Sequence, residues 1–238
     1  MDDPRPLEVG FAARRMKLLV PGDQGTRFVA TEIFRGKCYR PVEGMPAPKA
    51  ILDIGANVGL ATAFFRLAYP DAAIHCVEPD PNALRCLREN AARAGNCHVH
   101  PVGLYDRDCT MTLNASSNTA LSSLGFNPSA RAAPIEVQLR DAGGFVRELG
   151  IAFDLLKIDT EGVEVPILRS LGASAHAAAT IHLEFHSDAD RRLIDDLLHP
   201  THYLWRASLD SPHRGNLTYV ARSLAPALKA WLTPLVLA

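Results

Sequence analysis

Short apolar runs alternate with segments of helical periodicity along most of the chain, from about residue 50 to residue 221. Apolar runs bounded by turn residues predict buried strands, and apolar residues spaced three or four apart predict amphipathic helices. Strands joined through helices form right-handed crossovers, so the pattern predicts a mostly parallel sheet with helices on both faces. The predicted strands are residues 50–54, 73–77, 98–102, 153–158, 180–185, 203–207 and 217–221, with β-like pieces at 110–113 and 135–139; the predicted helices are residues 60–68, 81–94, 145–149, 166–171 and 189–198.

The segments outside this alternation are less regular. Residues 1–48 predict an arm with short strands at 27–33 and 38–39, which ends in a proline-rich linker at residues 46–48. We expect this arm to cap the substrate or to contact a second subunit. Residues 49–222 form the main domain, and residues 223–238 form an apolar tail that docks on it or contacts a second copy in a homodimer. The polar segment 114–128 is either a substrate loop or an ordinary surface loop.

The overall composition narrows the classes of function. With 238 residues, of which 47% are hydrophobic and 21% charged, the chain has the makeup of a globular protein with a full core. A net charge of −1 gives no general attraction to nucleic acid or to an anionic membrane. The five cysteines lack the paired spacing of a metal site, and the sequence shows neither a signal peptide nor a membrane span. These observations predict reduced thiols and a cytoplasmic protein.

A glycine turn follows the first predicted strand, in the string Ile51-Leu-Asp-Ile-Gly-Ala-Asn-Val-Gly59. The next strand ends at Glu78, 25 positions beyond Asp53. A unit of strand, glycine turn, helix and acid-terminated strand forms a nucleotide pocket, in which the carboxylate accepts hydrogen bonds from ribose hydroxyls. Asn57 stands where a dinucleotide fingerprint needs its second glycine to admit a pyrophosphate. The pattern therefore favours a ribose ligand without phosphate, such as S-adenosylmethionine, over NAD or FAD.

Ionisable residues gather near the ends of two predicted strands that should be apolar on both faces. The first strand ends with Lys157, Asp159 and Glu161, and the second with His182, Glu184 and His186. Alternate residues of a strand share a face, so each set of three points to one side of the sheet. Buried charges are costly unless they are paired or used. The residues therefore form either a structural ion-pair network, for example Lys157 with Glu184, or an active site.

Metal binding is a further interpretation of these strand ends, with Asp159, His182, Glu184 and His186 as candidate ligands. Alternate residues of one strand lie about 6.5 to 7 Å apart. That spacing is too wide for three of them to reach one ion through bonds of about 2 Å unless the strand bends. We therefore expect a reaction without a metal, in which Glu184 or His186 takes a proton from a hydroxyl nucleophile.

Several of these strings, taken in order, resemble the FkbM family of S-adenosylmethionine-dependent methyltransferases. They are Leu52-Asp-Ile-Gly-Ala-Asn-Val-Gly59, Val77-Glu-Pro-Asp-Pro81, Glu89-Asn-Ala, Leu156-Lys-Ile-Asp-Thr-Glu-Gly162 with Glu164, and Leu183-Glu-Phe-His186. The resemblance covers about residues 49–186, with Thr160 where the family more often has valine. It implies the class I methyltransferase fold, a Rossmann-like α/β fold. It also implies methylation of a hydroxyl group on a sugar, polyketide or other secondary metabolite, either free or tethered to a carrier protein.

The resemblance also implies roles for individual residues. The turn 55–59 would wrap the methionine end of S-adenosylmethionine, Glu78 would hold the ribose, and Asp159 would border the methionine or the acceptor. Glu184, His186 or Glu161 would act as the base, with Lys157 orienting the carboxylates. The expected cofactor-binding residues are Asp53, Gly55, Ala56, Asn57, Gly59, Glu78, Pro79 and Asp159, and the expected catalytic residues are Lys157, Asp159, Glu161, Glu184 and His186.

Two other functions remain compatible with the sequence. An RNA ribose 2′-O-methyltransferase also uses a Lys-Asp pair near the fourth strand, but this chain lacks the basic surface that gripping RNA requires. A non-catalytic module that binds S-adenosylmethionine would share the glycine turn. Such a module would tolerate substitution of Glu184 and His186, whereas an enzyme would not.

Overall fold

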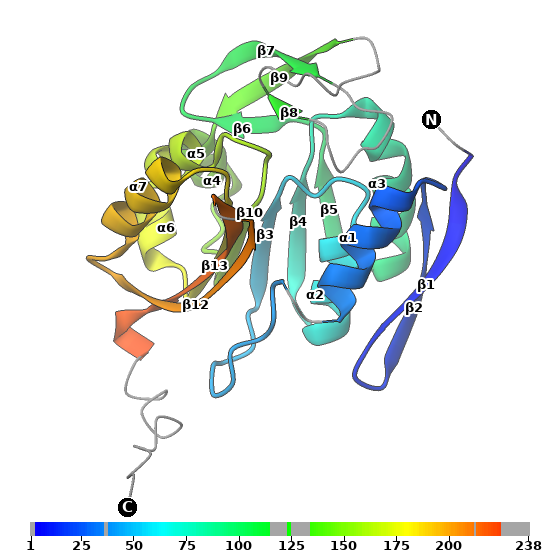
Figure 1. Ribbon diagram of the computed structural model, residues 1–238, viewed down its shortest axis with the longest axis horizontal. Coiled ribbons are helices and arrows are strands. Elements are labelled where there is room, and N and C mark those ends of the chain that lie inside the picture. Colours follow the sequence, from blue (N-terminus) through cyan, green and yellow to red (C-terminus); the bar gives the residue numbers. More distant parts are fainter. Residues whose placement is uncertain (1–2, 36–37, 115–122, 125–133, 212, 225–238) are drawn as a thin grey trace, which may run out of the picture.

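The computed structural model describes residues 3–35, 38–114, 123–124, 134–211 and 213–224. Its centre is a seven-stranded sheet in the order β12-β13-β11-β10-β3-β4-β5 (Figure 1). Strand β13 is antiparallel to both of its neighbours and every other neighbouring pair is parallel, which confirms the mostly parallel α/β fold. The strands are β3 (Ala50–Ile54), β4 (Ala73–Val77), β5 (Cys97–His100), β10 (Leu155–Ile158), β11 (Thr180–Phe185), β12 (His202–Ser211) and β13 (Arg214–Ala221).

Helices cover both faces of this sheet because its central strands are apolar on both sides. Ile51 and Leu52 are neighbours in β3, both are 0% exposed, and they belong to two different apolar clusters. The cluster of Ile51 includes residues of α1, α2 and α3, and the cluster of Leu52 includes residues of α4, α5, α6 and α7. The helices are α1 (Gln24–Phe34), α2 (Leu60–Ala68), α3 (Pro81–Ala94), α4 (Ala142–Leu149), α5 (Glu164–Leu171), α6 (Ala173–Ala177) and α7 (Asp188–Leu198).

A second, four-stranded sheet in the order β6-β9-β7-β8 lies above the carboxyl ends of β3, β4 and β5, at the top of Figure 1. The two β-like pieces at 110–113 and 135–139 pair antiparallel within it. The predicted strand 98–102 is shorter than expected, because β5 ends at His100 and the chain joins this second sheet from Gly103 onward. Its strands are β6 (Gly103–Tyr105), β7 (Cys109–Asn114), β8 (Ser123–Leu124) and β9 (Ile135–Asp141).

The arm differs from the sequence prediction. Residues 27–33 lie in helix α1 and not in a strand, and residues 38–39 form a bend. Asp23 begins α1 as its N-cap by accepting a hydrogen bond of 2.8 Å from the backbone N–H of Thr26. This cap and the tertiary packing outweigh the strand preference of the branched and aromatic residues in the segment. The strands of the arm are instead β1 (Arg5–Phe11) and β2 (Arg14–Val20), which form an antiparallel hairpin.

The hairpin packs against α2 and α3 (Figure 1). Asn90 of α3 fixes it: its side chain accepts a hydrogen bond of 2.7 Å from the N–H of Leu19 and donates one of 2.8 Å to the carbonyl of the same residue. The same amide donates to the carbonyl of Val58 at 2.7 Å, which joins the arm to the glycine turn after β3. The arm is therefore part of the core. The division of the chain at residue 48 stays a prediction.

Several expectations fall beyond this description. Of the predicted substrate loop 114–128, residues 115–122 and 125–128 lie outside the described residues, as do residues 225–238 of the apolar tail. A homodimer contact through the arm or the tail stays a prediction. The five cysteines are free thiols, as expected. In the part of the chain that the structure describes, none of the helices has both the length and the apolar character needed to cross a bilayer.

Candidate active site

A pocket of about 870 Å³ opens at the edge of the central sheet where β3, β4, β10 and β11 end. The turn after β3 forms its floor together with the residues that follow β4 and β10. Helix α1 of the arm contributes one wall through Phe28, Val29 and Ile33. Glu184 of β11 and Arg214 of β13 also line the pocket. Ligands of parallel sheets bind at the carboxyl ends of the strands, so this pocket is the candidate active site.

The glycine turn after β3 brings the backbone to the pocket. Gly55 has φ +76° and Gly59 has φ +88°, a conformation that suits glycine and strains most other residues. The N–H groups of Gly55 and Ala56 both donate to the carbonyl of Val77 at 3.0 Å, which ties the turn to β4. Gly55, Ala56 and Asn57 all line the pocket. These three turn residues thus border the space where a ligand would lie, whereas Gly59 and Asp53, also predicted to bind the cofactor, are not among the residues that line it.

Glu78 follows β4 and faces the same space. It is 7% exposed and accepts hydrogen bonds from the N–H of Asn57 at 2.8 Å and from the N–H of Asp80 at 2.7 Å. Burial raises the pKa of Glu78 to about 7, although these backbone hydrogen bonds act in the opposite direction. Its neighbour Pro79 also lines the pocket. The carboxylate is thus held rigidly beside the glycine turn, where it can accept hydrogen bonds from a ribose.

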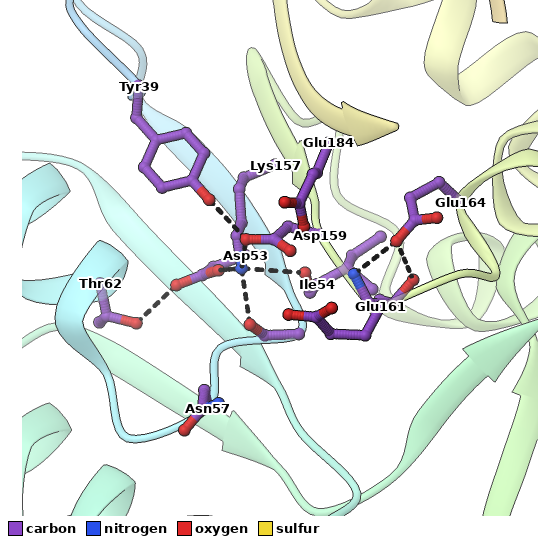
Figure 2. Close-up of polar contacts among 12 residues, drawn as sticks. Tyr39, Asp53, Ile54, Asn57, Thr62, Lys157, Asp159, Glu161, Glu164 and Glu184 are labelled. Carbon is purple, nitrogen blue, oxygen red and sulfur yellow. Dashed lines mark hydrogen bonds and ion pairs between the residues drawn. The ribbon is translucent and has the colours of Figure 1, made fainter. Parts of the chain in front are cut away.

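Lys157 of β10 supplies the positive charge beneath the turn. Its Nζ lies 3.1 Å from Oδ1 of Asp53 and donates to the carbonyls of Ile54 and Gly55 at 3.2 and 2.6 Å. Asp53 is 0% exposed and accepts a further hydrogen bond of 2.7 Å from the hydroxyl of Thr62. Burial lowers the pKa of Lys157, but the charges of nearby carboxylates raise it by more, so the ammonium group persists. The buried ion pair joins β10 to β3 (Figure 2), and the hydrogen bond to the carbonyl of Gly55 joins β10 to the turn.

Asp159 and Glu184 form a pair of carboxyl groups at the ends of β10 and β11 (Figure 2). Burial and the charge of Asp159 raise the pKa of Glu184 to about 8. Burial also raises the pKa of Asp159, but Lys157, whose Nζ lies 3.8 Å away, and the hydrogen bond from Glu184 lower it by more. Of the two carboxyl groups, Glu184 therefore holds a proton more readily than Asp159. Glu184 also accepts a hydrogen bond of 2.7 Å from Nε of Arg214, so its ion-pair partner is Arg214 and not Lys157.

His186 lies just after β11, within a group of carboxylates. Its Nε2 is 3.2 Å from Glu161 and 3.3 Å from Glu184, and its Nδ1 is 3.5 Å from Glu164. Burial lowers the pKa of His186, but the hydrogen bonds to these three carboxylates outweigh it and raise the pKa to about 12. An imidazolium has no free lone pair with which to accept a proton. This argues against His186 as the base, one of the roles expected from the sequence.

The candidate metal ligands are only partly brought together. Among the described residues, the ligand atoms of Glu161, Glu184 and His186 lie within 4.8 Å of one another. His182 does not join them: its ring stacks on Phe65, and its Nδ1 lies 3.1 Å from the hydroxyl of Thr218. His182 and Glu184 share a strand face, but only Glu184 is at the strand end that borders the pocket. The positive charges next to Glu161 and Glu184 come from Arg214 and His186.

Two residues of the site were missed or underrated in the sequence. Tyr39, in the arm, donates a hydrogen bond to Oδ2 of Asp159 at 2.5 Å, although 120 positions separate the two. No local pattern could have indicated it. Arg214 stands at the start of β13, and the string His213-Arg-Gly-Asn216 that contains it indicates a place at the mouth of the pocket only weakly. An arginine at the beginning of the last strand, beside an acidic strand end, was the available signal.

The sequence model of a protein family, described as the Methyltransferase FkbM domain, matches residues 53–214 of this chain. The chain belongs to the FkbM methyltransferase family. It is 31% identical over 175 residues to the 31-O-demethyl-FK506 methyltransferase FkbM of Streptomyces tacrolimicus, which covers 60% of this chain and 67% of that protein. It is 28% identical over 166 residues to Methyltransferase 1 of Beauveria bassiana, with 60% of this chain and 66% of that protein covered, so the chain spans about two thirds of these relatives.

Solved structures agree on the fold. A putative SAM-dependent methyltransferase from Streptococcus mutans superposes with a TM-score of 0.52 at 8% identity, covering 93% of this chain and 57% of that one. The fibrillarin pre-rRNA processing protein of Methanococcus jannaschii gives 0.52 at 10% identity, covering 92% and 83%. The central sheet is thus that of the class I methyltransferases. As a member of the FkbM family, the protein is a methyltransferase whose methyl donor is S-adenosylmethionine.

The residues at the pocket fit this donor. S-adenosylmethionine carries a ribose and a positive sulfonium but no phosphate. Glu78 offers a buried carboxylate for the ribose, and Lys157, the lysine beneath the turn, is already neutralised by Asp53. A Cβ at Gly55 would collide with the carbonyl oxygen of Asp159, so only glycine lets the turn lie against the end of β10 at the border of the pocket.

Proposed function

We propose that this protein transfers the methyl group of S-adenosylmethionine to a hydroxyl oxygen of a small molecule, with Glu184 as the general base. The observation that carries the proposal is the carboxyl pair of Glu184 and Asp159 in the same pocket as the glycine turn and Glu78. A hydroxyl must lose its proton as the new bond to carbon forms. A carboxyl group whose pKa is raised toward neutrality suits that task.

In this proposal the residues around the turn hold the donor. S-adenosylmethionine supplies a methyl group already activated by its sulfonium. Gly55, Ala56 and Asn57 contact the methionine end through the backbone, and Glu78 accepts hydrogen bonds from the ribose, with Pro79 beside it. Gly59 allows the turn to enter α2, and Asp53 acts through Lys157. What remains for the protein is to place the acceptor oxygen in line with the carbon–sulfur bond.

Glu184 is favoured over the other two candidate bases for physical reasons. The carboxyl groups around His186 raise its pKa and hold it as an imidazolium. Glu161 and Glu184 both contact His186 and Arg214, but the side chain of Glu161 is more exposed, 22% against 9%, and is therefore less desolvated. In Glu184, by contrast, burial and the charge of Asp159 keep the carboxyl basic. Lys157, Asp159 and Arg214 then orient the carboxyl groups.

The acceptor we propose is a hydroxyl of a sugar, polyketide or other secondary metabolite. The name of the Streptomyces relative indicates that it methylates the 31-oxygen of an FK506 precursor. Another relative, the AMB antimetabolite synthetase AmbE of Pseudomonas aeruginosa, matches this chain at 29% identity over 205 residues, which is 69% of this chain and 10% of AmbE. Both a free acceptor and one tethered to a carrier protein therefore belong in any assay.

The test is methyl transfer from isotopically labelled S-adenosylmethionine to a panel of sugars, polyketide alcohols and carrier-bound hydroxy acids, followed by mass spectrometry. We expect one labelled methyl group on an oxygen of one class. RNA oligonucleotides serve as the comparison for a ribose 2′-O-methyltransferase. Methylation of RNA in place of these alcohols, or of nitrogen in any acceptor, would contradict the proposal. If S-adenosylmethionine binds, no acceptor is methylated, and Glu184→Gln and His186→Gln leave its affinity unchanged, the protein is a binding module.

A further inference from the structure

Tyr39 enters the candidate active site from the arm, outside the residues that match the family model. It is 6% exposed, and its hydroxyl points at Asp159 (Figure 2). Its backbone has φ +56°, a left-handed conformation that is uncommon for a bulky residue. Such strain persists only where the surroundings hold it, and it concentrates at functional sites.

The surroundings of Tyr39 direct its hydroxyl. Its ring packs against Phe65 and His182, with ring centroids 5.8 and 5.7 Å away. On another side, Nζ of Lys157 lies 5.9 Å from the ring centroid. With the ring fixed in this way, the hydroxyl meets Oδ2 of Asp159 at 2.5 Å. This distance is at the short end for a hydroxyl that donates to a carboxylate.

We propose that Tyr39 is a positioning residue whose hydroxyl keeps Asp159 ionised, so that the proton of the carboxyl pair lies on Glu184. The inference rests on the proposed role of Glu184 as the base. Tyr39 does not touch the acceptor in this scheme. It acts through Asp159, whose negative charge makes Glu184 more basic.

The charges around the pair explain why one hydroxyl matters. Lys157 is 3.8 Å from Asp159, beyond hydrogen-bond distance, and its closer partner is Asp53. Without the hydroxyl of Tyr39, Asp159 would therefore compete better for the shared proton. Glu184 would then ionise at a lower pH. The ionisable groups that face the pair are Tyr39 from the arm, Asp53 from β3 through Lys157 of β10, Glu161 after β10, Glu164 of α5 through His186, His186 after β11, and Arg214 of β13.

The experiment compares Tyr39→Phe with Tyr219→Phe. Tyr219 is a buried tyrosine whose hydroxyl donates to Asp195, outside the pocket lining, so Tyr219→Phe removes the same kind of hydrogen bond elsewhere. The full chain is labelled with ¹³C at the carboxyl groups of Asp and Glu and titrated by NMR. The signal of Glu184 is assigned from its loss in Glu184→Gln. The titration and the assignment of the Glu184 signal both proceed without an acceptor substrate.

We expect the titration midpoint of Glu184 to fall by about one pH unit in Tyr39→Phe, a tenfold change in its acid dissociation constant. Tyr219→Phe should leave it unchanged. An unchanged midpoint in Tyr39→Phe, with any loss of thermal stability similar to that of Tyr219→Phe, would show that Tyr39 is merely structural and overturn the inference.

Calorimetry with S-adenosylmethionine separates this outcome from failure of the proposed function. If wild-type protein binds S-adenosylmethionine but Glu184→Gln later proves as active as wild type, the base assignment fails whatever Tyr39 does. If Glu184→Gln is inactive and the midpoint in Tyr39→Phe does not move, only the inference about Tyr39 fails. We expect Tyr39→Phe to bind S-adenosylmethionine within about twofold of wild type, because the hydroxyl acts on the carboxyl pair and not on the turn.

Discussion

Gly55 passes so close to the main chain of Asp159 that a Cβ at position 55 would lie 1.9 Å from the carbonyl oxygen of Asp159. This contact joins the end of β3 to the end of β10. It explains why the turn needs glycine here even apart from its φ of +76°. A displacement of the glycine turn would therefore also displace Asp159 of the carboxyl pair.

Gly55→Ala is expected to abolish binding of S-adenosylmethionine and to lower the melting temperature strongly, because the backbone must move to admit the methyl group. The matched control is Gly150→Ala. Gly150 also has a positive φ, +64°, but a Cβ there would meet nothing within 4 Å. Gly150→Ala should therefore lose only about 1 kcal/mol of stability and keep its affinity for S-adenosylmethionine. Equal behaviour of the two variants, by calorimetry and thermal unfolding, would contradict the importance of the contact.

Glu78 should make cofactor binding depend on pH. Its pKa is raised to about 7 by burial, and the ionised form can accept hydrogen bonds from both ribose hydroxyls. We expect affinity for S-adenosylmethionine to rise as the pH increases from 6 to 8, by up to about tenfold. Glu78→Gln should bind more weakly and show a flatter dependence. Calorimetry at several pH values checks this, and a wild-type affinity that is constant over the range would remove the ribose assignment.

Glu184 should control the rate and its pH dependence. Because its pKa is raised to about 8, the proton-accepting form increases as the pH rises through 8, and kcat/KM with the acceptor found in the panel assay should increase in parallel. Glu184→Gln should lower kcat by about 10² to 10⁴ and change the Kd of S-adenosylmethionine by less than about twofold. Glu148→Gln, which alters an exposed ion pair with Arg140, is the control and should match wild type. A rate that stays constant from pH 6 to 9 would contradict this role.

His182 should make the fold sensitive to acid. Burial, with a smaller contribution from Arg206, lowers the pKa of His182 to about 3, whereas the unfolded chain titrates near 6.5. Below pH 6.5 the unfolded state therefore binds the proton first, and the free energy of unfolding falls as the pH is lowered toward 3. In His182→Phe this contribution disappears, so its stability should depend on pH less steeply than that of wild type.

The expected difference in slope is about 1.4 kcal/mol per pH unit between pH 6 and 4. Phenylalanine keeps a ring beside Phe65, and loss of the contact with Thr218 shifts stability by an amount that does not depend on pH. Urea unfolding at each pH measures both effects. Parallel curves for the two proteins would refute the assignment. Binding of S-adenosylmethionine at pH 8 should stay as in wild type.

The central sheet was predictable because β3, β4, β10 and β11 are short, mostly apolar and followed by turns or acids. The helical structure of residues 27–33 was not predictable, because Phe28, Val29 and Ile33 favour a strand locally. The cap at Asp23 and the packing on α2 stabilise the helix instead. The carboxyl ends of parallel strands meet at one edge, so the meeting of Glu78, Asp159 and Glu184 could be expected.

The sequence could not predict which residues of different strands and helices contact one another. His182 and Glu184 look equivalent by alternation, yet one is packed between aromatic rings and the other lines the pocket. The protonation state of His186 depends on Glu161 and Glu164, which approach it only in the folded chain. Contacts of Tyr39 and Arg214 with the acidic residues likewise arise only from tertiary structure.

The side-chain amide of Asn90 bonds the free edge of β2 as a neighbouring strand would, since it accepts a hydrogen bond from the N–H of Leu19 and donates one to its carbonyl. A chain that began at residue 49 would leave that amide with only the carbonyl of Val58 and would expose the apolar side of α2 that the hairpin covers. Such a fragment should aggregate when expressed. Anyone who transplants this catalyst into a larger synthetase should therefore carry the N-terminal hairpin along with it.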